Sequence, residues 1–295
     1  MPPAIAEDHV SDVASLRRPA SHEPGGRKVR ALINYLEDDT HDSVWYAADS
    51  WRSHMPLRME TMQIEDVRPI RDRFSLDREG IFLADAPTSV KDFRGEAASK
   101  SYAPELEEAV KAATGAHKVV VSKNWVHRHS DRSERFGEEG TTFPGRYAHI
   151  DYSDLSGPLT ARQWLGDDPA ADELLKGRFA IYLWRALSPP PQDCPLCVAD
   201  ATTVEAEDLV VSHIVLGPTP DREMRIQTNM VAFNPRHRWV YFSDMHRDEL
   251  LIFRGYASDP TRFRRVPHTA FDDPSAGDDA PPRESIDIRC VAFFD

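Results

Sequence analysis

The chain has 295 residues, of which 40% are hydrophobic, and a formal net charge of −13. This length and hydrophobic share allow a sizeable core, in one large domain or two modest ones. The excess of acidic residues, 49 against 36 basic ones, argues against a general binder of nucleic acid or of an anionic membrane, and leaves small-molecule ligands open.

The predicted elements begin after a polar segment, residues 1–27, which we interpret as a mobile N-terminal tail. It has no basic segment followed by an apolar one, as a secretory signal would, and no apolar run in the chain is long enough to cross a bilayer. The three cysteines do not suggest a disulfide framework. We therefore expect a cytoplasmic protein without a membrane anchor.

The first half of the chain predicts strands around one clear helix. Residues 29–36 are apolar and β-rich, and residues 74–87 read as strand, turn and strand. In residues 103–115, apolar residues recur at helical spacing and Gly115 is typical of a helix C-cap. Residues 117–129, with a run of valines, predict a further strand.

From residue 146 onward the pattern is one short strand after another. Pro, Asp, Gly or Asn bound these β-rich segments, which are 146–153, 178–187, 208–216, 224–233, 238–245, 249–258 and 285–294. A helical insertion at 159–177 interrupts them, and residues 272–283 are typical of a surface loop. Seven or so closely spaced strands favour a sandwich or jelly roll.

His149 and Asp151 lie one residue apart in the segment GRYAHIDYSD. On a strand, residues i and i+2 face the same way with Cα atoms about 6.5–7 Å apart, so an imidazole and a carboxylate can converge on one ion. A second histidine from a distant strand would complete the two-His, one-carboxylate site of non-haem Fe(II) oxygenases. The H-x-D pair alone is common, and a strand that happens to carry both residues is the other interpretation.

The end of the chain offers the remaining groups for such a site. His268 stands in VPHTAFDDP, and Arg283 and Ser285 follow in PRESI. On a strand, Arg283 and Ser285 share a face, and a buried arginine can clamp a carboxylate while the hydroxyl adds a hydrogen bond. A metal group followed by an anion clamp calls for an anionic co-substrate that also reaches the metal, and the dicarboxylate 2-oxoglutarate meets both demands.

Other motifs allow different interpretations. The segment 127–140 is similar to a cupin metal motif, with His127, His129 and Glu134 as ligands, but it lacks the expected preceding glycine and otherwise reads as a polar loop. The CPLC segment, with Cys194 and Cys197, has redox spacing without the strand and helix of a thioredoxin, so we expect a loop with two ordinary thiols.

These motifs carry a resemblance to a known family. The chain resembles the hydroxylase/desaturase family of secondary metabolism, which includes fungal gibberellin desaturase and the hydroxylase-like component of cephamycin methoxylation. The matching segments span most of residues 29–295 and include 74–83, 105–121, 148–153, 182–187, 194–200, 237–258, 267–274 and 282–294. The resemblance implies an Fe(II)- and 2-oxoglutarate-dependent oxygenase with a mainly β fold, flanking helices (α+β) and a double-stranded β-helix (jelly-roll) core.

The resemblance also implies roles for particular residues. His149, Asp151 and His268 would be the iron ligands, and Arg283, helped by Ser285, would bind the 2-oxoglutarate carboxylate. His246, two residues after Asp244, is expected not to be a ligand. Arg185, because an arginine after tryptophan is usual in the family, and Arg289, by its strand parity with Arg283, are candidate contacts to the substrate.

The expected protein is a single oxygenase domain over residues 28–295, with the jelly-roll core in roughly 117–295. It would use Fe(II), 2-oxoglutarate as co-substrate and dioxygen to hydroxylate, desaturate or oxidatively cyclise a natural product or amino-acid-derived molecule. Two alternatives stay open: a cupin-type metalloenzyme that ignores 2-oxoglutarate, and a non-catalytic jelly-roll binding protein. The sequence indicates neither the identity of the substrate nor the oligomeric state.

Overall fold

The computed structural model describes residues 26–294, apart from 38, 39, 41, 48, 49, 139, 177, 218 and 260–263. Nearly all of the predicted tail, residues 1–25, lies outside the described residues. In the described part of the chain, no helix combines the length and the apolar character that crossing a membrane requires.

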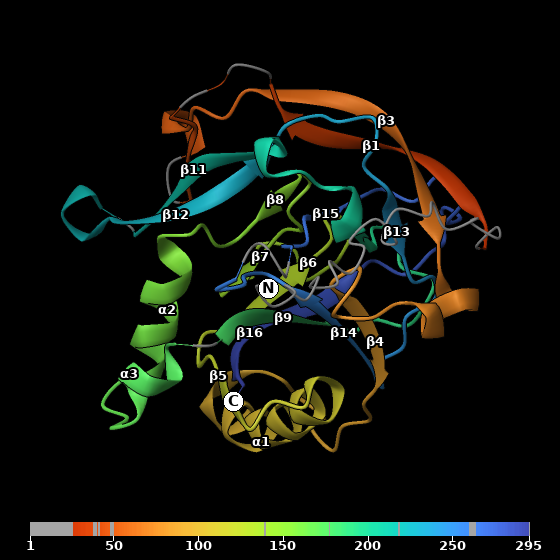
Figure 1. Ribbon diagram of the computed structural model, residues 1–295. Coiled ribbons are helices and arrows are strands. Elements are labelled where there is room, and N and C mark those ends of the chain that lie inside the picture. The colour runs from red at the N-terminus through yellow and green to blue at the C-terminus, as the bar shows by residue number, and fades with distance from the viewer. Residues whose placement is uncertain are drawn as a thin grey trace, which may run out of the picture.

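Strands dominate the described residues and form two sheets (Figure 1). The strands of the larger sheet are β1 (Lys28–Leu36), β2 (Val44–Tyr46), β3 (Leu57–Asp66), β8 (His149–Ile150), β10 (Leu196–Ala199), β11 (Leu209–Leu216), β12 (Met224–Val231), β13 (Trp239–Tyr241) and β15 (His268–Ala270). Those of the smaller sheet are β4 (Ile81–Asp85), β5 (Lys118–Val121), β6 (Val126–His129), β7 (Thr141–Thr142), β9 (Arg178–Ala186), β14 (Glu249–Arg254) and β16 (Glu284–Phe293).

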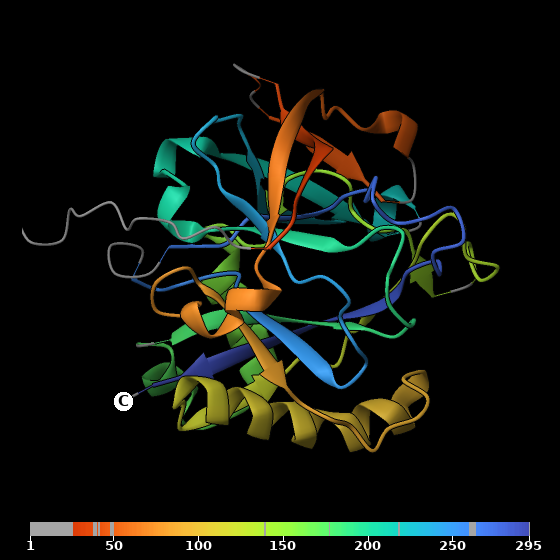
Figure 2. The same ribbon diagram turned by 90° about the vertical axis from the view of Figure 1, so that its right-hand side faces the viewer.

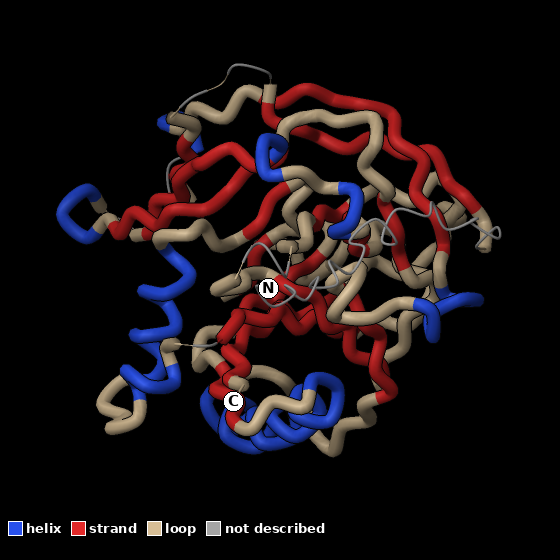
Figure 3. Tube along the Cα trace, in the orientation of Figure 1, coloured by secondary structure: helices blue, strands red, loops and turns tan. Residues whose placement is uncertain are grey.

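The order of strands in each sheet brings together segments that are far apart in the sequence. The larger sheet runs β1-β3-β13-β10-β15-β8-β12-β11-β2, and the smaller runs β4-β14-β9-β16-β6-β7, with β5 also paired to β16. β16 is therefore central: β9 pairs along one side of it, and β6 and β5 pair in succession along the other. Figure 3 shows how few helices accompany these strands, which confirms the mainly β class.

The main hydrophobic core lies between the two sheets. Side chains of the smaller sheet, such as Trp184 and Phe253, pack against side chains of the larger sheet, such as Leu196 and Val198. Both faces of the smaller sheet are covered, because the α-helix α1 (Gly95–Thr114) packs on its outer side (Figure 2). Two covered faces explain why β14 is buried at every position instead of alternating.

The predicted helix is confirmed, and it is longer than expected. Gly115 ends α1 in the left-handed conformation, with φ of 73°, as the C-cap prediction required. The helix begins at Gly95, and Pro104 lies inside it, at the place where the sequence suggested a start. The predicted helical insertion forms two shorter helices, α2 (Ser156–Leu165) and α3 (Ala171–Leu174).

Leu106→Ala should destabilise the fold by about 2–5 kcal/mol, because it empties part of a well-packed core. Leu106 is 1% exposed and belongs to the cluster between α1 and the smaller sheet. Denaturant unfolding followed by circular dichroism measures the change. Glu107→Ala, on the neighbouring position of the same helix, is the control and should change stability by less than about 0.5 kcal/mol; an equal loss in both variants would contradict this packing.

Three strand predictions were wrong in detail. In residues 74–87 only β4 forms, because Glu79 turns back to accept a hydrogen bond from the Ser75 N–H (3.1 Å) and Gly80 has a positive φ of 77°. Residues 117–129 form two strands, β5 and β6, instead of one. The CPLC segment is not all loop, since Cys197 lies in β10, where pairing with β13 and β15 completes the larger sheet.

Candidate metal and co-substrate site

Strand pairing brings His149 and His268 together. His149 on β8 lies directly opposite His268 on the antiparallel strand β15. Side chains of directly opposed residues stand about 4.5–5.5 Å apart at Cβ, and here the two imidazole rings have centroids 4.3 Å apart. The short strand β8 therefore places one histidine beside the other, as the two-histidine prediction required.

Asp151 follows β8 directly and joins this pair. The candidate ligand atoms of His149, Asp151 and His268 all lie within 4.8 Å of one another, and within the described residues this is the one such group close enough to hold a metal ion. The three side chains are largely buried: the exposed fractions of the His149 and Asp151 side chains are 7% and 14%. Two imidazoles and one carboxylate are a donor set that suits Fe(II) and leaves further positions open.

The protonation of the two histidines also suits a metal. Nδ1 of His149 lies 2.8 Å from the carbonyl oxygen of Tyr147, which can only accept, so Nδ1 carries the proton. Nε2, the ring nitrogen left for a metal, lies 3.2 Å from Oδ1 of Asp151. Burial lowers the pKa of His268 to about 3, with the nearby His149 adding to the effect, so His268 is in the neutral form that binds metals.

Arg289 holds the carboxylate of this group. Its Nε and Nη2 donate to Oδ2 of Asp151, at 3.1 and 2.9 Å, while Oδ1 faces His149. Burial alone would raise the pKa of Asp151, but Arg289 and the hydrogen bond with His149 outweigh it and keep that pKa well below its usual range. Arg289 thus contacts Asp151, where we had predicted a contact to the substrate.

A buried guanidinium suited to an anion lies in the same cavity. Arg283 is 1% exposed, and its Nε donates to the Ser285 hydroxyl and its Nη1 to the carbonyl of Cys194, each at 3.0 Å. The ring of Trp184 lies under the guanidinium, 5.1 Å from it. No carboxylate among the described residues forms an ion pair with Arg283. A buried positive charge without a counter-ion favours a bound anion, so the cavity fits a carboxylate of 2-oxoglutarate.

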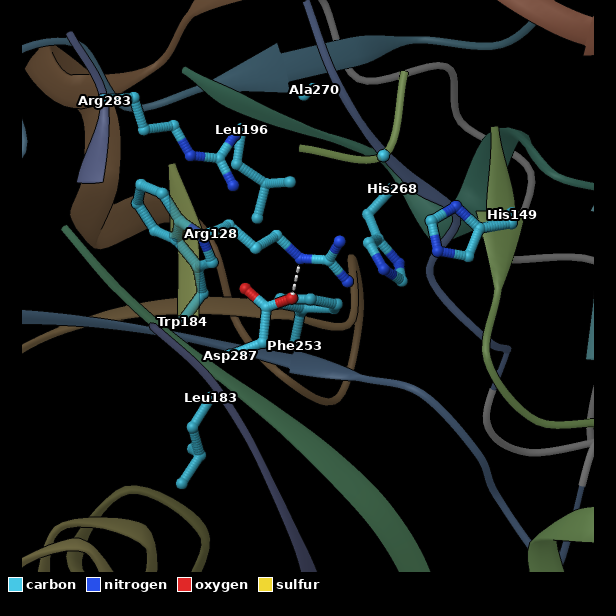
Figure 4. Close-up of a pocket in the computed structure, with 11 residues that line it drawn as sticks. Arg128, His149, Leu183, Trp184, Leu196, Phe253, His268, Ala270, Arg283 and Asp287 are labelled. Atoms are coloured by element: carbon cyan, nitrogen blue, oxygen red, sulfur yellow. Dashed lines mark hydrogen bonds and ion pairs between the residues drawn. The ribbon is translucent and has the colours of Figure 1, made fainter. Parts of the chain in front are cut away.

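The cavity that the two histidines share with Arg283 lies between the two sheets (Figure 4). His149, His268 and Ala270 face it from the larger sheet, and Arg283 and Trp184 from the smaller. Leu183, Leu196 and Phe253 give it apolar walls, while Arg128 and Asp287 are further charged lining residues.

The sequence interpretation missed Arg128 and Asp287. Asp287 shares its strand face with Ser285 and Arg289, so the period-two pattern of β16 was the signal that could have found it. Arg128 lies between His127 and His129, the two histidines of the possible cupin motif, and it faces the cavity from the smaller sheet.

The structure does not bring Arg185 to the cavity. Its guanidinium lies over the ring of Tyr102 on α1, 5.3 Å from the centroid, and donates to the carbonyl of Arg247. It is therefore on the outer face of the smaller sheet. The lining is instead supplied by its neighbour Trp184.

The alternative ligand sets do not assemble among the described residues. Glu134 is exposed, and Nδ1 of His129 is engaged with the carbonyl of Arg135 at 2.9 Å. His127, His129 and Glu134 therefore form no group of the kind that His149, Asp151 and His268 form, and His246 lies outside that group as well. Cys194 and Cys197 are buried free thiols, and burial raises both of their pKa values, which keeps them protonated.

Comparison with known proteins agrees with this chemistry. A family model described as an oxidoreductase/YMDC permease-like domain matches residues 33–293. The Fe(II)/2-oxoglutarate-dependent dioxygenase nvfI of Aspergillus novofumigatus is 33% identical over 239 residues, which cover 79% of this chain and 82% of that protein. The hydroxylase/desaturase efuI of Hormonema carpetanum is 30% identical over 261 residues, or 82% of this chain and 86% of that protein.

The fold is also similar to a solved structure of the iron and alpha-ketoglutarate-dependent endoperoxidase NvfI. The two align with a TM-score of 0.79 and 28% sequence identity, covering 92% of this chain and 99% of the other. The chain therefore belongs to this family, that of the Fe(II)- and 2-oxoglutarate-dependent dioxygenases and hydroxylase/desaturases of secondary metabolism.

Proposed function

We propose that this chain binds Fe(II) through His149, Asp151 and His268, binds 2-oxoglutarate through Arg283 and Ser285, and oxidises a small-molecule substrate. The observation that carries the proposal is one cavity that holds a buried guanidinium, without a carboxylate partner in the described residues, together with His149 and His268, whose imidazoles lie beside the Asp151 carboxylate. This pairing of a metal group with an anion clamp distinguishes a 2-oxo-acid-dependent enzyme from a cupin-type enzyme.

The residues of the chain would bind and orient the reactants. Bound Fe(II) would supply the oxidative chemistry, in which 2-oxoglutarate and dioxygen give succinate and carbon dioxide while the substrate is oxidised. The negative charge of Asp151 offsets part of the charge of the ion, and Arg289 fixes which carboxylate oxygen faces the histidines. Leu196, Phe253 and Trp184 exclude water from the cavity.

We further propose that residues 28–295 are one oxygenase domain with a double-stranded β-helix core in roughly 117–295. The contact of Arg289 on β16 with Asp151, which directly follows β8 in the opposite sheet, supports this topology. We expect a natural product or amino-acid-derived substrate, which would be hydroxylated, desaturated or oxidatively cyclised; the name hydroxylase/desaturase of several relatives supports the first two outcomes. The endoperoxidase activity named for NvfI is a further outcome of the same oxidative chemistry.

An anaerobic titration with Fe(II) and then 2-oxoglutarate tests the proposal. We expect a charge-transfer absorption band in the visible that saturates at one 2-oxoglutarate per chain and is lost in His149→Ala. A cupin-type enzyme would bind the metal without this band. A non-catalytic binding protein would bind no iron at His149 and Asp151. Either result would overturn the proposal. If the band appears as expected, a substrate screen coupled to succinate detection would identify the substrate.

A further inference from the structure

Arg128 presents a second guanidinium to the cavity. It lies on β6 directly opposite Ser285 of β16, on the strand next to the one that carries the anion clamp. Its Nε donates to Oδ2 of Asp287, and its Nη1 donates to the carbonyl of Phe143 at 2.9 Å. No hydrogen bond from Nη2 to any described residue is present. Two of the three nitrogens are thus fixed by the protein, and the third is available to a ligand.

The position of this guanidinium differs from that of Arg283. Arg283 immediately precedes β16 and Asp287 lies on it, four residues later, which on extended backbone places their Cα atoms about 13 Å from each other. The ion pair with Asp287 keeps Arg128 at the latter end, and Figure 4 shows its guanidinium between Arg283 and the ring of His268. The two guanidiniums and His268 therefore lie in a row, with Arg283 at one end, Arg128 in the middle and His268 at the other end.

The charges of the lining favour an anion between the two arginines. Asp287 is the one carboxylate among the described residues that line the cavity, against the two guanidiniums of Arg128 and Arg283. Burial lowers the pKa of Arg283, and the positive charge of Arg128 contributes to the same effect, so the two cations repel each other across the cavity. A dianion bound between them would offset this repulsion and accept hydrogen bonds from both guanidiniums.

We propose that Arg128 binds the carboxylate next to the keto group of the 2-oxo acid, while Arg283 binds the far carboxylate. This inference rests on the proposed function, since it assigns the other end of the same co-substrate. Asp287 acts as a positioning residue, because its ion pair with Nε of Arg128 aims the rest of the guanidinium at the cavity. The co-substrate is then held by one arginine at each end, and its keto acid end lies beside His268.

Binding of two acids to the Fe(II)-loaded protein without oxygen tests the inference. The probes are 2-oxoglutarate and 2-oxopentanoate, which has the same chain length but no far carboxylate. Arg128→Gln should raise the dissociation constants of both acids at least tenfold, because it removes a contact to the end that they share. Arg283→Gln should raise that of 2-oxoglutarate and leave that of 2-oxopentanoate within twofold of the unmodified protein.

Two further variants guard against an effect of folding. The double variant Arg128→Gln/Asp287→Asn removes the ion pair without leaving an unpaired carboxylate. It should raise the dissociation constants of both acids as Arg128→Gln does. Arg94→Gln removes a charge from an arginine whose side chain is 62% exposed and is paired with Asp92, and it should change neither constant. Thermal unfolding of each variant verifies that it is folded before its constants are compared.

The outcomes separate this inference from the proposed function. Unchanged binding of both acids by the folded Arg128 variants would overturn the role of Arg128 and leave the iron and Arg283 sites intact. A loss confined to 2-oxoglutarate would also overturn it, because it would place Arg128 at the far carboxylate. Failure of the unmodified protein to bind 2-oxoglutarate would overturn both this inference and the proposed function.

Discussion

His149→Ala and His268→Ala should each abolish substrate-dependent formation of succinate. Each change removes one of two imidazoles whose ring centroids lie 4.3 Å apart, and the remaining two ligands would hold the ion too weakly and in the wrong geometry. A loss of several kcal/mol of transition-state stabilisation corresponds to about a thousandfold or more in rate. The measurement is succinate released per iron, with iron content determined in the same sample.

A matched histidine outside the site provides the control. His246→Ala removes an imidazole in a loop that does not join the group of His149, Asp151 and His268, and it should retain turnover. The two site variants should still unfold cooperatively, so that lost activity reflects the missing ligand. Full turnover in either site variant would rule out the proposed iron ligands.

Arg283→Gln should chiefly raise the concentration of 2-oxoglutarate that the enzyme requires. Truncating one partner of a buried, hydrogen-bonded charge pair costs about 2–5 kcal/mol, which corresponds to a weakening of binding of roughly 30-fold or more. Arg283 is 1% exposed, so water does not screen the charge that it offers to the anion. The dependence of initial rate on 2-oxoglutarate concentration measures the shift, while the dependence on the substrate should change little.

Two comparisons make the result specific. Arg236→Gln, at an exposed arginine that contacts Asn234, should leave the 2-oxoglutarate requirement unchanged. Arg283→Lys keeps the charge but loses the planar fork, so its requirement should fall between those of the unmodified protein and Arg283→Gln. An unchanged requirement in Arg283→Gln would remove this residue from the proposed co-substrate site.

The metal group could be predicted from the sequence because its geometry is local. The spacing of His149 and Asp151 fixes a shared direction whatever the rest of the fold does. The same argument predicted that Arg283, Ser285 and Arg289 share one face of a strand; Ser285 and Arg289 lie on β16, and Arg283 immediately precedes it. Family resemblance indicated His268, because this residue is too far along the chain from His149 and Asp151 for any local pattern to connect them.

The roles of the arginines could not be predicted, since they depend on which elements cover each face. Trp184 and Arg185 are adjacent on a strand and therefore point to opposite faces of the sheet. Only the packing of α1 decides that Arg185 is on the outer face. Arg289 was predicted to contact the substrate, yet its partner is Asp151, which directly follows β8 of the opposite sheet, and neither strand's sequence indicates how close the two sheets come. The strand β10 was missed because it is short and gains its hydrogen bonds from two distant strands.

The pairing of β8 with β15 also governs when in the life of the chain a metal can bind. His149 and His268 face each other across the sheet but stand about 120 positions apart in sequence, so their approach closes a long loop of chain. An unfolded chain offers no such site, and a metal bound only by the native state stabilises it by mass action, by about 2.7 kcal/mol at a free concentration 100 times the dissociation constant. Iron would thus bind after the sheet has formed and stabilise it, instead of nucleating its folding. A chelator should therefore lower the melting temperature of the loaded protein while leaving the fold intact.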